Sequence, residues 1–512
     1  MNKIVKKIVA VVSLLAMSLN IVACGGGNLG GGNDYEVLLD NPGFWGELAK
    51  TTAGSSGSGG LGGGATGEIE ITGDPSKAVA YDGSEVTVKF YHTMGQKLQG
   101  VLNAWIPEFN KTYPKIKIEH ATYGDYPGLR DQITTEIAGG NYPNIAYCYP
   151  DHVALYNSAG VVATLDDYIA SSAMGFTKAE VNEFVRGYYE EGRAYGDNKM
   201  YTLPYSKSTE VLYYNKTFFN EHNLKVPTTW DEMETVMQQI VTIDPNCVPL
   251  GYDSEANWFI TMTEQLGTPY TSAKGEKFLF DVEANHSFVG RLRKWYQLGL
   301  VTTEETYGSY TSDLFTQTDP NEQRSYMCIG SSAGASYQTP DPVMNENNET
   351  VHPFEVGVAL PPQIDPSNPR VISQGPSLCM FVKQNKQEMA ATWLFMKFLT
   401  TNLGLQANFS SESGYAPVIK NLDQKHPGYA ADLAAANGYD KLQTTCVKQC
   451  LAQEGAMYVS PAFIGSSGAR DQVGILMQNC FVNAPAAGQT EADFIKGEFA
   501  KIIEKLRYDY KD

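Results

Sequence analysis

One short stretch of the sequence has the residue types and spacing of a catalytic nucleophile. Residues 330–334, Gly-Ser-Ser-Ala-Gly, match the G-x-S-x-G pattern, in which a serine on a sharp strand-to-helix turn acts as the nucleophile. Residues 326–329 could form the strand, but Pro340 would stop the helix that must follow. A catalytic triad also needs an acid and then a histidine downstream, where only His352 and His426 are available. The pattern therefore gives weak support for a hydrolase.

Other patterns of catalytic residues are missing from the sequence. The histidines are scattered, and none forms an H-E-x-x-H motif or another close pair that would bind a catalytic zinc. Glu190 and Glu191 are neighbours that point in different directions on a helix, so they do not suit the paired carboxylates of a glycosidase. The G-x-x-x-x-G-K-[ST] loop of an ATPase does not occur. We therefore expect no enzymatic activity, no metal and no cofactor.

The N-terminus has the pattern of an export signal. Lys3, Lys6 and Lys7 precede an apolar run at 8–19, which is too short for the roughly 20 residues that span a bilayer. Residues 21–24, Ile-Val-Ala-Cys, resemble a bacterial lipobox, in which the signal is cut before the cysteine and the sulfur carries a diacylglyceryl group. A plain signal peptide with an incidental cysteine is the alternative.

We expect residues 1–23 to be the signal peptide and lipidated Cys24 to anchor the chain to the outer face of the cell membrane. Residues 24–67 are dominated by Gly, Ser and small polar residues, and as a flexible tether they would span on the order of 35 Å. An apolar island, residues 35–48, interrupts this pattern. Three interpretations of this island stay open: it docks on the folded part of the chain, it docks on a membrane partner, or it is only an apolar stretch of linker.

The remaining residues, from about Glu68 to Asp512, have the composition of an ordinary globular protein. This segment is longer than the chain length that usually folds around a single hydrophobic core, so two lobes are expected. The formal net charge of −19 argues against nucleic acid or anionic lipid as a partner. No later segment is long and apolar enough to cross a membrane.

Seven of the eight cysteines remain once Cys24 is assigned to the lipid, so at least one is unpaired. Most lie in apolar contexts that indicate small buried hydrophobic residues. Cys446 and Cys450 are four residues apart, a spacing that permits a disulfide but is not ideal for one on a helix. The pairing of these cysteines stays open.

Strands and helices alternate at the start of the body. Alternating β-branched and aromatic residues predict strands at 86–91, 116–120 and 145–149, with helices at 98–113 and 129–138 between them. This β-α-β-α-β order predicts an α/β lobe with a largely parallel sheet. Later apolar periodicities predict helices at 231–243, 288–298, 387–400 and 491–506.

Several stretches match one family pattern in order and spacing. They are Val88–Gly95 at a first strand, Gly139–Ile145 at a turn into a strand, Leu203–Lys216 at a crossing between lobes, and Gly414–Val418 at a late turn. Together they resemble the extracellular solute-binding proteins of bacterial ABC importers, of the carbohydrate and glycerol-3-phosphate type. The similarity runs from about residue 85 to residue 505.

This resemblance implies an α/β fold of the two-lobe, periplasmic-binding-protein-like kind (type II), with hinge strands and a cleft between the lobes. It places 84–205 with 375–412 in the first lobe and 207–372 with 416–505 in the second. It also implies a monomeric receptor that closes on its ligand and is then recognised by the transmembrane subunits of an ABC permease. The ligand would be a sugar, an oligosaccharide or a polyol phosphate. The competing hypothesis is a surface-anchored glycan-degrading hydrolase or adhesin.

The resemblance also indicates which residues contact the ligand. Two departures from the glycerol phosphate members matter: Pro150 replaces a cleft glutamate, with Asp151 next to it, and residues 463–470 replace an arginine-rich loop. Both favour a neutral sugar over a phosphate. Strand ends of α/β sheets and the hinge strand add further candidates. The predicted ligand-binding residues are His92, Tyr126, Asp151, Ser208, Glu210, Trp258, Ser331 or Ser332, Gly375, Tyr415 and Arg470.

Overall fold

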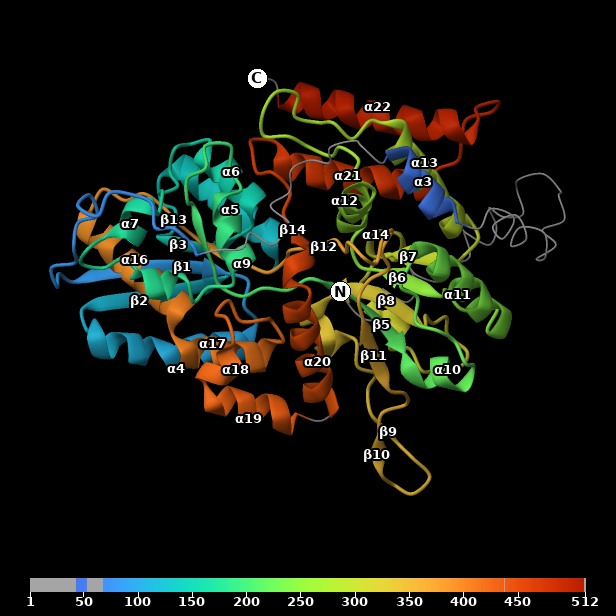
Figure 1. Cartoon of the computed structure of the whole chain (residues 1–512), viewed down its shortest axis with the longest axis horizontal. Coiled ribbons are helices and arrows are strands. Elements are labelled where there is room, and N and C mark those ends of the chain that lie inside the picture. Colours follow the sequence, from blue (N-terminus) through green and yellow to red (C-terminus); the bar gives the residue numbers. More distant parts are fainter. Residues whose placement is uncertain (1–42, 53–67, 437, 511–512) are drawn as a thin grey trace. The chain divides into compact units, whose positions relative to one another are not determined.

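The structure is a computed structural model that describes residues 43–52, 68–436 and 438–510. The predicted signal peptide, Cys24 and the predicted tether apart from residues 43–52 therefore lie outside the described residues. Residues Phe44–Thr52 form helix α3, so this part of the tether is not the flexible coil that the sequence predicts, because apolar side chains of this helix are buried. The described part of the chain is built around two five-stranded sheets, each with its own helices (Figure 1). We call these two assemblies the first lobe and the second lobe.

The sheet of the first lobe has the strand order β2-β1-β3-β13-β4. Burial alternates along β1, where Val88, Phe90 and His92 face the core. β1 is parallel to β2 and β3, as the sequence predicts, but β13 is antiparallel to both of its neighbours. The sheet is mixed because β13 enters from the crossing between the lobes and not from a β-α-β unit. The strands are β1 (Val86–His92), β2 (Ile116–Thr122), β3 (Ile145–Cys148), β4 (Thr202–Pro204) and β13 (Ser377–Met380).

The sheet of the second lobe has the strand order β11-β5-β8-β6-β7. Its strands are β5 (Glu210–Asn215), β6 (Leu250–Tyr252), β7 (Val301–Thr303), β8 (Met327–Ser331) and β11 (Val356–Ala359). Its main helices are α11 (Trp230–Ile243), α12 (Glu255–Leu266), α13 (Glu283–Gln297), α21 (Ser466–Val482) and α22 (Glu491–Asp509). A capping box between Thr229 and Glu232 starts α11, which confirms the helix predicted there.

The other predicted helices are also present, with shifted ends. The helices around the first sheet are α4 (Gln96–Thr112), α5 (Tyr126–Gly139), α16 (Lys386–Thr401) and α17 (Leu403–Ser413), and α4 continues through Pro107. The remaining elements are α3 (Phe44–Thr52), α6 (Pro150–Asn157), α7 (Asp166–Ala170), α8 (Lys178–Val181), α9 (Arg186–Glu190), η1 (Glu191–Arg193), α10 (Lys216–Glu221), α14 (Glu304–Tyr307), α15 (Ser312–Phe315), η2 (Ser332–Tyr337), β9 (Val343–Met344), β10 (Thr350–Val351), β12 (Val371–Ile372), α18 (Leu422–Lys425), α19 (Pro427–Ala435), α20 (Gly438–Ala452), η3 (Glu454–Ala456) and β14 (Met457–Tyr458).

Crossing segments join the two lobes side by side. Ser208 and Gln374 exchange backbone hydrogen bonds of 3.0 and 2.8 Å, and Lys207 and Ala416 exchange bonds of 3.0 and 2.7 Å. The buried Lys207 ammonium donates to Glu191 Oε1 at 2.7 Å. Because each of these buried charges has a close partner, the ion pair holds the crossing in one arrangement.

The structure contradicts the nucleophile pattern and the possible disulfide. Ser332 follows β8 directly but starts a 3-10 turn instead of an α-helix, and its buried hydroxyl accepts from Thr209 N at 3.1 Å. A strand-turn-helix elbow is therefore not formed. Cys446 and Cys450 are free and buried, like the other cysteines in the described part of the chain. Among the described helices, none has both the length and the apolar character to cross a bilayer.

Candidate functional site

A pocket of about 200 Å³ lies between the two lobes. Its walls combine aromatic rings, charged side chains and the crossing segment 372–374. Both lobes contribute residues to the pocket wall, so a molecule bound there would contact the first and the second lobe at the same time. The residues used in the argument below are Tyr126, Arg130, Tyr149, Asp151, His152 and Glu191 from the first lobe, Tyr270, Thr271, Tyr458, Ser467, Arg470 and Asp471 from the second, and Gln374 from the crossing.

The first-lobe wall is built at the carboxyl end of β3 and at the start of α5. Tyr149 occupies the N-cap position of α6, and Pro150 starts that helix, so Asp151 lies three residues after the end of β3. Asp125 caps α5 by accepting from Gly128 N at 2.7 Å, and this places Tyr126 at the pocket. The Tyr126 and Tyr149 rings pack edge to face with centroids 4.8 Å apart. Burial raises the pKa of Tyr126 well above its ordinary value, so its phenol stays neutral.

The second-lobe wall is tied to the hinge strand β5. Arg470 on α21 donates to the side-chain oxygen of Asn257. Asn257 Nδ2 donates in turn to Glu210 Oε1 at 2.8 Å, and Tyr252 donates to Glu210 Oε2 at 2.6 Å. Burial raises the pKa of Glu210 to about 7, against the two hydrogen bonds, which lower it. Arg470 is thus connected through Asn257 to Glu210, the first residue of β5, which begins close to the crossing between the lobes.

The two walls also touch each other directly. Arg130 Nη1 on α5 donates to Ser467 Oγ at 3.0 Å and to Asp471 Oδ2 at 3.3 Å, both on α21. Helix α21 also contacts α6, which follows β3. These contacts join the two lobes at the pocket, in addition to the crossing segments.

Three buried polar atoms of the pocket wall have no hydrogen-bond partner within the described residues. They are Tyr270 Oη, Thr271 Oγ1 and Gln374 Oε1. Leaving such a group buried without a partner costs about 1–3 kcal/mol. Polar side chains of this kind, beside aromatic rings, suit a ligand that carries hydroxyl groups.

The charges of the wall balance and do not favour an anion. Arg130 pairs with Asp471, and Glu191 pairs with the buried Lys207. Arg470 and Asp151 add one charge of each sign. Burial lowers the pKa of His152, so its ring is neutral near pH 7. The wall suits a neutral guest with polar edges and flat apolar faces.

Comparison with known proteins identifies the family. A family model described as bacterial extracellular solute-binding protein matches residues 104–437. The chain belongs to this family. It is 26% identical over 167 residues to the multiple sugar-binding protein of Streptococcus mutans, a match that covers 32% of this chain and 36% of that protein. It is 25% identical over 171 residues to the sn-glycerol-3-phosphate-binding periplasmic protein UgpB of Escherichia coli K12, covering 33% and 38%. The matched segment thus spans little more than a third of these curated relatives.

Solved structures of sugar-binding and related proteins share the fold over a longer range. An ABC substrate-binding protein of Listeria monocytogenes in complex with cycloalternan has a TM-score of 0.64 at 16% identity, covering 83% of this chain and 98% of that one. UgpB of Mycobacterium tuberculosis in complex with glycerophosphocholine has a TM-score of 0.61 at 15% identity, covering 83% and 99%. This solute-binding protein therefore has the two-lobe α/β fold of periplasmic binding proteins, as the sequence predicts.

Several predicted site residues of this solute-binding protein lie at the pocket. Tyr126, Asp151 and Arg470 line it. Gly375 adjoins it and donates its backbone N–H to Tyr149 Oη at 3.3 Å. Gly375 has a φ of +85°, and a Cβ there would lie 2.4 Å from Ser206 O, so the crossing requires glycine at this position.

Two further predicted residues stand just behind the pocket wall. The Tyr415 phenol lies near that of Tyr126, and each phenol affects the pKa of the other. Glu210 is connected to the wall through Asn257 and Arg470, as described above. Tyr415 and Glu210 therefore do not line the pocket themselves, but each is next to or connected with a residue that does.

The remaining predicted residues do not line the pocket. Ser208 forms the backbone crossing, and Ser331 and Ser332 stand where β8 runs into a turn. His92 is buried in the first-lobe core and its Nε2 lies 3.0 Å from His120 Nδ1. Trp258 is fully buried and stacks on Tyr252 with centroids 4.6 Å apart. His92 and Trp258 are buried because each side chain faces the hydrophobic core of its own lobe.

The sequence did not single out several residues of the wall. Arg130 follows Tyr126 by four residues on α5, so the helical period could have placed both on the same face. Asp471 directly follows the predicted Arg470. Tyr270 and Gln374 lie in irregular connections, where the sequence holds no periodic signal that would place them.

Proposed function

We propose that this protein is a receptor that captures a sugar or oligosaccharide between its lobes and delivers it to the permease of an ABC importer. The observation that carries this proposal is a pocket, lined by both lobes, in which the aromatic rings of Tyr126, Tyr149 and Tyr270 stand beside polar and charged side chains. Such a wall matches the hydroxyl edge and apolar face of a sugar ring. The name of the Streptococcus mutans relative and the cycloalternan in the Listeria monocytogenes structure agree with it.

Glycerol-3-phosphate or a related polyol phosphate is the second candidate ligand for the same receptor role. The UgpB relatives support it, as do the guanidinium groups of Arg130 and Arg470 at the pocket. The charge balance disfavours it: Asp471 pairs with Arg130 and Glu191 with Lys207, and Asp151 opposes Arg470, so a phosphate would meet no net positive charge. We therefore rank a neutral sugar first.

We further propose that the protein performs no chemistry on its ligand. The related proteins are named as binding proteins, and closure of two lobes turns binding energy into a change of shape that a permease can recognise. The hydrolase or adhesin hypothesis rested on Ser332 and on the export signal alone. A strand-turn-helix elbow around Ser332 is not formed, which weakens it.

The cellular setting belongs to the same proposal. We infer that the chain is exported, cut before Cys24 and held by a lipid on that residue at the outer face of the membrane, where it acts as a monomer. The lipobox-like residues 21–24 support this. Mass spectrometry of the membrane fraction would detect the diacylglyceryl mass on the mature N-terminus.

A ligand screen tests the receptor role. Sugars, oligosaccharides and glycerol phosphates are added singly to the purified protein, and the melting temperature is measured for each. A ligand that binds only the folded state raises the melting temperature by mass action, without forming product. Stabilisation by sugars alone supports the first candidate, and stabilisation by glycerol phosphates alone supports the second. Steady release of product from a glycan, abolished in Ser332→Ala, would overturn the receptor role.

A further inference from the structure

Helix α3 (Phe44–Thr52), which ends the apolar island of the N-terminal segment, is packed into the second lobe (Figure 1). Its Trp45 side chain is 1% exposed, and Leu48 and Thr52 are also buried. An isolated helix of nine residues is only marginally stable in water, so this helix depends on the surface that covers it. Of the three interpretations of the island, docking on the body is the one observed for residues 44–48.

The docking surface is a cluster of tryptophans. The Trp45 ring lies 5.5 Å from Trp295 on α13 and 6.2 Å from Trp230 on α11, and Trp258 on α12 packs against both of these rings. Trp230, Trp258 and Trp295 are fully buried. Trp45 is thus the fourth member of one aromatic cluster, although it is separated from the others by more than 180 residues of sequence.

Polar contacts fix the two ends of the helix. At its start, Trp45 N donates to Asp231 Oδ1 at 3.4 Å, and the Arg291 guanidinium lies 4.8 Å from the centre of the Phe44 ring. At its end, Thr52 Oγ1 donates to Leu266 O at 2.6 Å. Arg291 is itself held by a buried ion pair with Glu234 at 2.8 Å. The cation over Phe44 is therefore in a fixed position.

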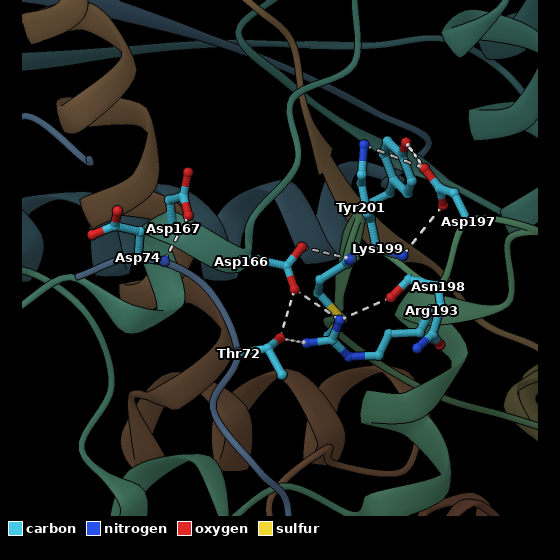
Figure 2. Close-up of polar contacts among 10 residues, drawn as sticks. Thr72, Asp74, Asp166, Asp167, Arg193, Asp197, Asn198, Lys199 and Tyr201 are labelled. Atoms are coloured by element: carbon cyan, nitrogen blue, oxygen red, sulfur yellow. Dashed lines mark hydrogen bonds and ion pairs between the residues drawn. The ribbon is translucent and has the colours of Figure 1, made fainter. Parts of the chain in front are cut away.

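The chain is then fastened a second time, on the first lobe. Figure 2 shows Thr72 between Asp166 and Arg193: Thr72 Oγ1 donates to Asp166 Oδ1 at 2.8 Å and accepts from Arg193 Nη2 at 2.8 Å. Asp74 N donates to Asp167 Oδ1 at 2.8 Å. The N-terminal segment therefore meets the second lobe before it meets the first.

We propose that α3 is a docking element that transfers the attachment point of the N-terminal tether to the second lobe. This proposal rests on the lipid anchor of the proposed function for its consequence, but the docking itself does not. With α3 docked, 18 residues (25–42) separate Cys24 from the body, and with α3 released the separation is 43 residues (25–67). At about 3.5 Å per residue these stretches reach at most about 65 Å and about 150 Å. The docked helix thus keeps the second lobe within about 65 Å of the bilayer and leaves the first lobe to move relative to it.

Trypsin offers a direct test of docking, because Lys50 is the only Lys or Arg between residues 8 and 76. Cleavage after Lys50 requires local unfolding of α3. In the full chain, Trp45→Ala should raise the initial rate of this cleavage at least about tenfold, since the helix loses its buried anchor. Glu47→Gln is the matched control on the exposed face of the same helix. It removes only an exposed ion pair with Lys50 and no buried contact, so its rate should stay within about twofold of the unaltered protein. Equal rates in the unaltered protein and Trp45→Ala would overturn the proposal.

Hydrogen exchange covers the case in which Trp45→Ala fails to fold. On the unaltered chain, the amides of residues 47–52 should exchange at least about a hundredfold more slowly than those of a free peptide of the same sequence. Exchange at the free-peptide rate would overturn the docking without any variant.

The consequence for the membrane is tested on vesicles. The lipidated chain carries a donor dye at Gln297→Cys, on exposed α13 surface, and the vesicles carry an acceptor lipid. Energy transfer should fall in Trp45→Ala and remain unchanged in Glu47→Gln. Equal transfer in all three would overturn the shortened reach. A chain that does not associate with the vesicles would contradict the lipid anchor of the proposed function, while the protection of Lys50 would still report on the docking.

Discussion

Arg130 on α5 of the first lobe donates a hydrogen bond across the pocket mouth to Asp471 on α21 of the second lobe, at 3.3 Å. Ser467, one turn earlier on α21, accepts from the same Arg130 nitrogen at 3.0 Å. In the proposed receptor the ligand is held when the lobes are closed, so this contact would belong to the ligand-binding state. It therefore adds a favourable term to closure that does not depend on the ligand's own contacts.

Removal of the Arg130 contact should weaken ligand binding modestly. Asp471 is half exposed, so the ion pair is worth about 0.5–1 kcal/mol. Arg130→Met should thus raise the dissociation constant for the sugar by about two- to fivefold, as measured by calorimetry. Lys97→Met is the control, because it removes an exposed ion pair with Glu412 that lies away from the pocket. Equal affinities for Arg130→Met and the unaltered protein would show that the contact does not contribute to closure.

The unpartnered phenol of Tyr270 predicts opposite effects on stability and on binding. Tyr270→Phe removes a buried hydroxyl that has no partner among the described residues, so the ligand-free protein should become more stable or stay unchanged. In the proposed site the same change also removes a hydrogen bond to the ligand, so the binding free energy should become less favourable by about 1–2 kcal/mol. Thermal unfolding and calorimetry on the same samples measure both effects.

Tyr156→Phe separates the pocket from the core in this test. Tyr156 also carries a buried hydroxyl without a partner among the described residues, but it packs on Phe381 in the first-lobe core and does not line the pocket. We expect its affinity to equal that of the unaltered protein. If Tyr156→Phe and Tyr270→Phe bind equally well, the Tyr270 hydroxyl does not contact the ligand.

The sequence predicted the elements better than it predicted the pocket. Alternation along β1 and the capping box of α11 are local signals, and both elements are present. The same alternation places His92 on the buried face with Phe90, so the pattern itself argues for a core position at this strand end. Tyr126 was found through the family pattern and lines the pocket, whereas Tyr270 lies in a connection whose position depends on the tertiary fold. A single sequence cannot show which irregular segments meet across two lobes.

Trp258 illustrates how burial changes a prediction. The resemblance made it a candidate ligand-binding residue, but its ring stacks on Tyr252 inside the second lobe. Trp258→Ala should therefore lower the free energy of unfolding by about 3–5 kcal/mol, the usual cost of a large cavity. Denaturant unfolding measures this loss, and Trp258→Phe, which keeps an aromatic ring, should lose much less. A Trp258→Ala protein of unchanged stability but tenfold weaker sugar binding would instead place this ring in the site.

Glu210 should make the stability of the protein depend on pH near neutrality. Burial raises the pKa of Glu210 to about 7 in the folded protein, from 4.5 as its ordinary value. A carboxyl with a raised folded pKa stabilises the fold fully below 4.5, and this contribution is lost as the pH rises through about 7. The difference corresponds to about 3 kcal/mol. Glu210→Gln stays neutral at every pH and keeps an acceptor for Tyr252, so it should lose this pH dependence.

Denaturant unfolding at pH 5, 6, 7 and 8 tests the Glu210 prediction. The difference in unfolding free energy between Glu210→Gln and the unaltered protein should grow in favour of the variant from pH 5 to pH 8, because the other titrating groups are common to both. Glu85→Gln, at an exposed position, is the control and should give a constant difference. Since Glu210 holds Asn257, which accepts from Arg470, sugar affinity in the unaltered protein should follow the same pH range. A pH-independent difference between Glu210→Gln and the unaltered protein would mean that Glu210 does not titrate near neutrality in the folded state.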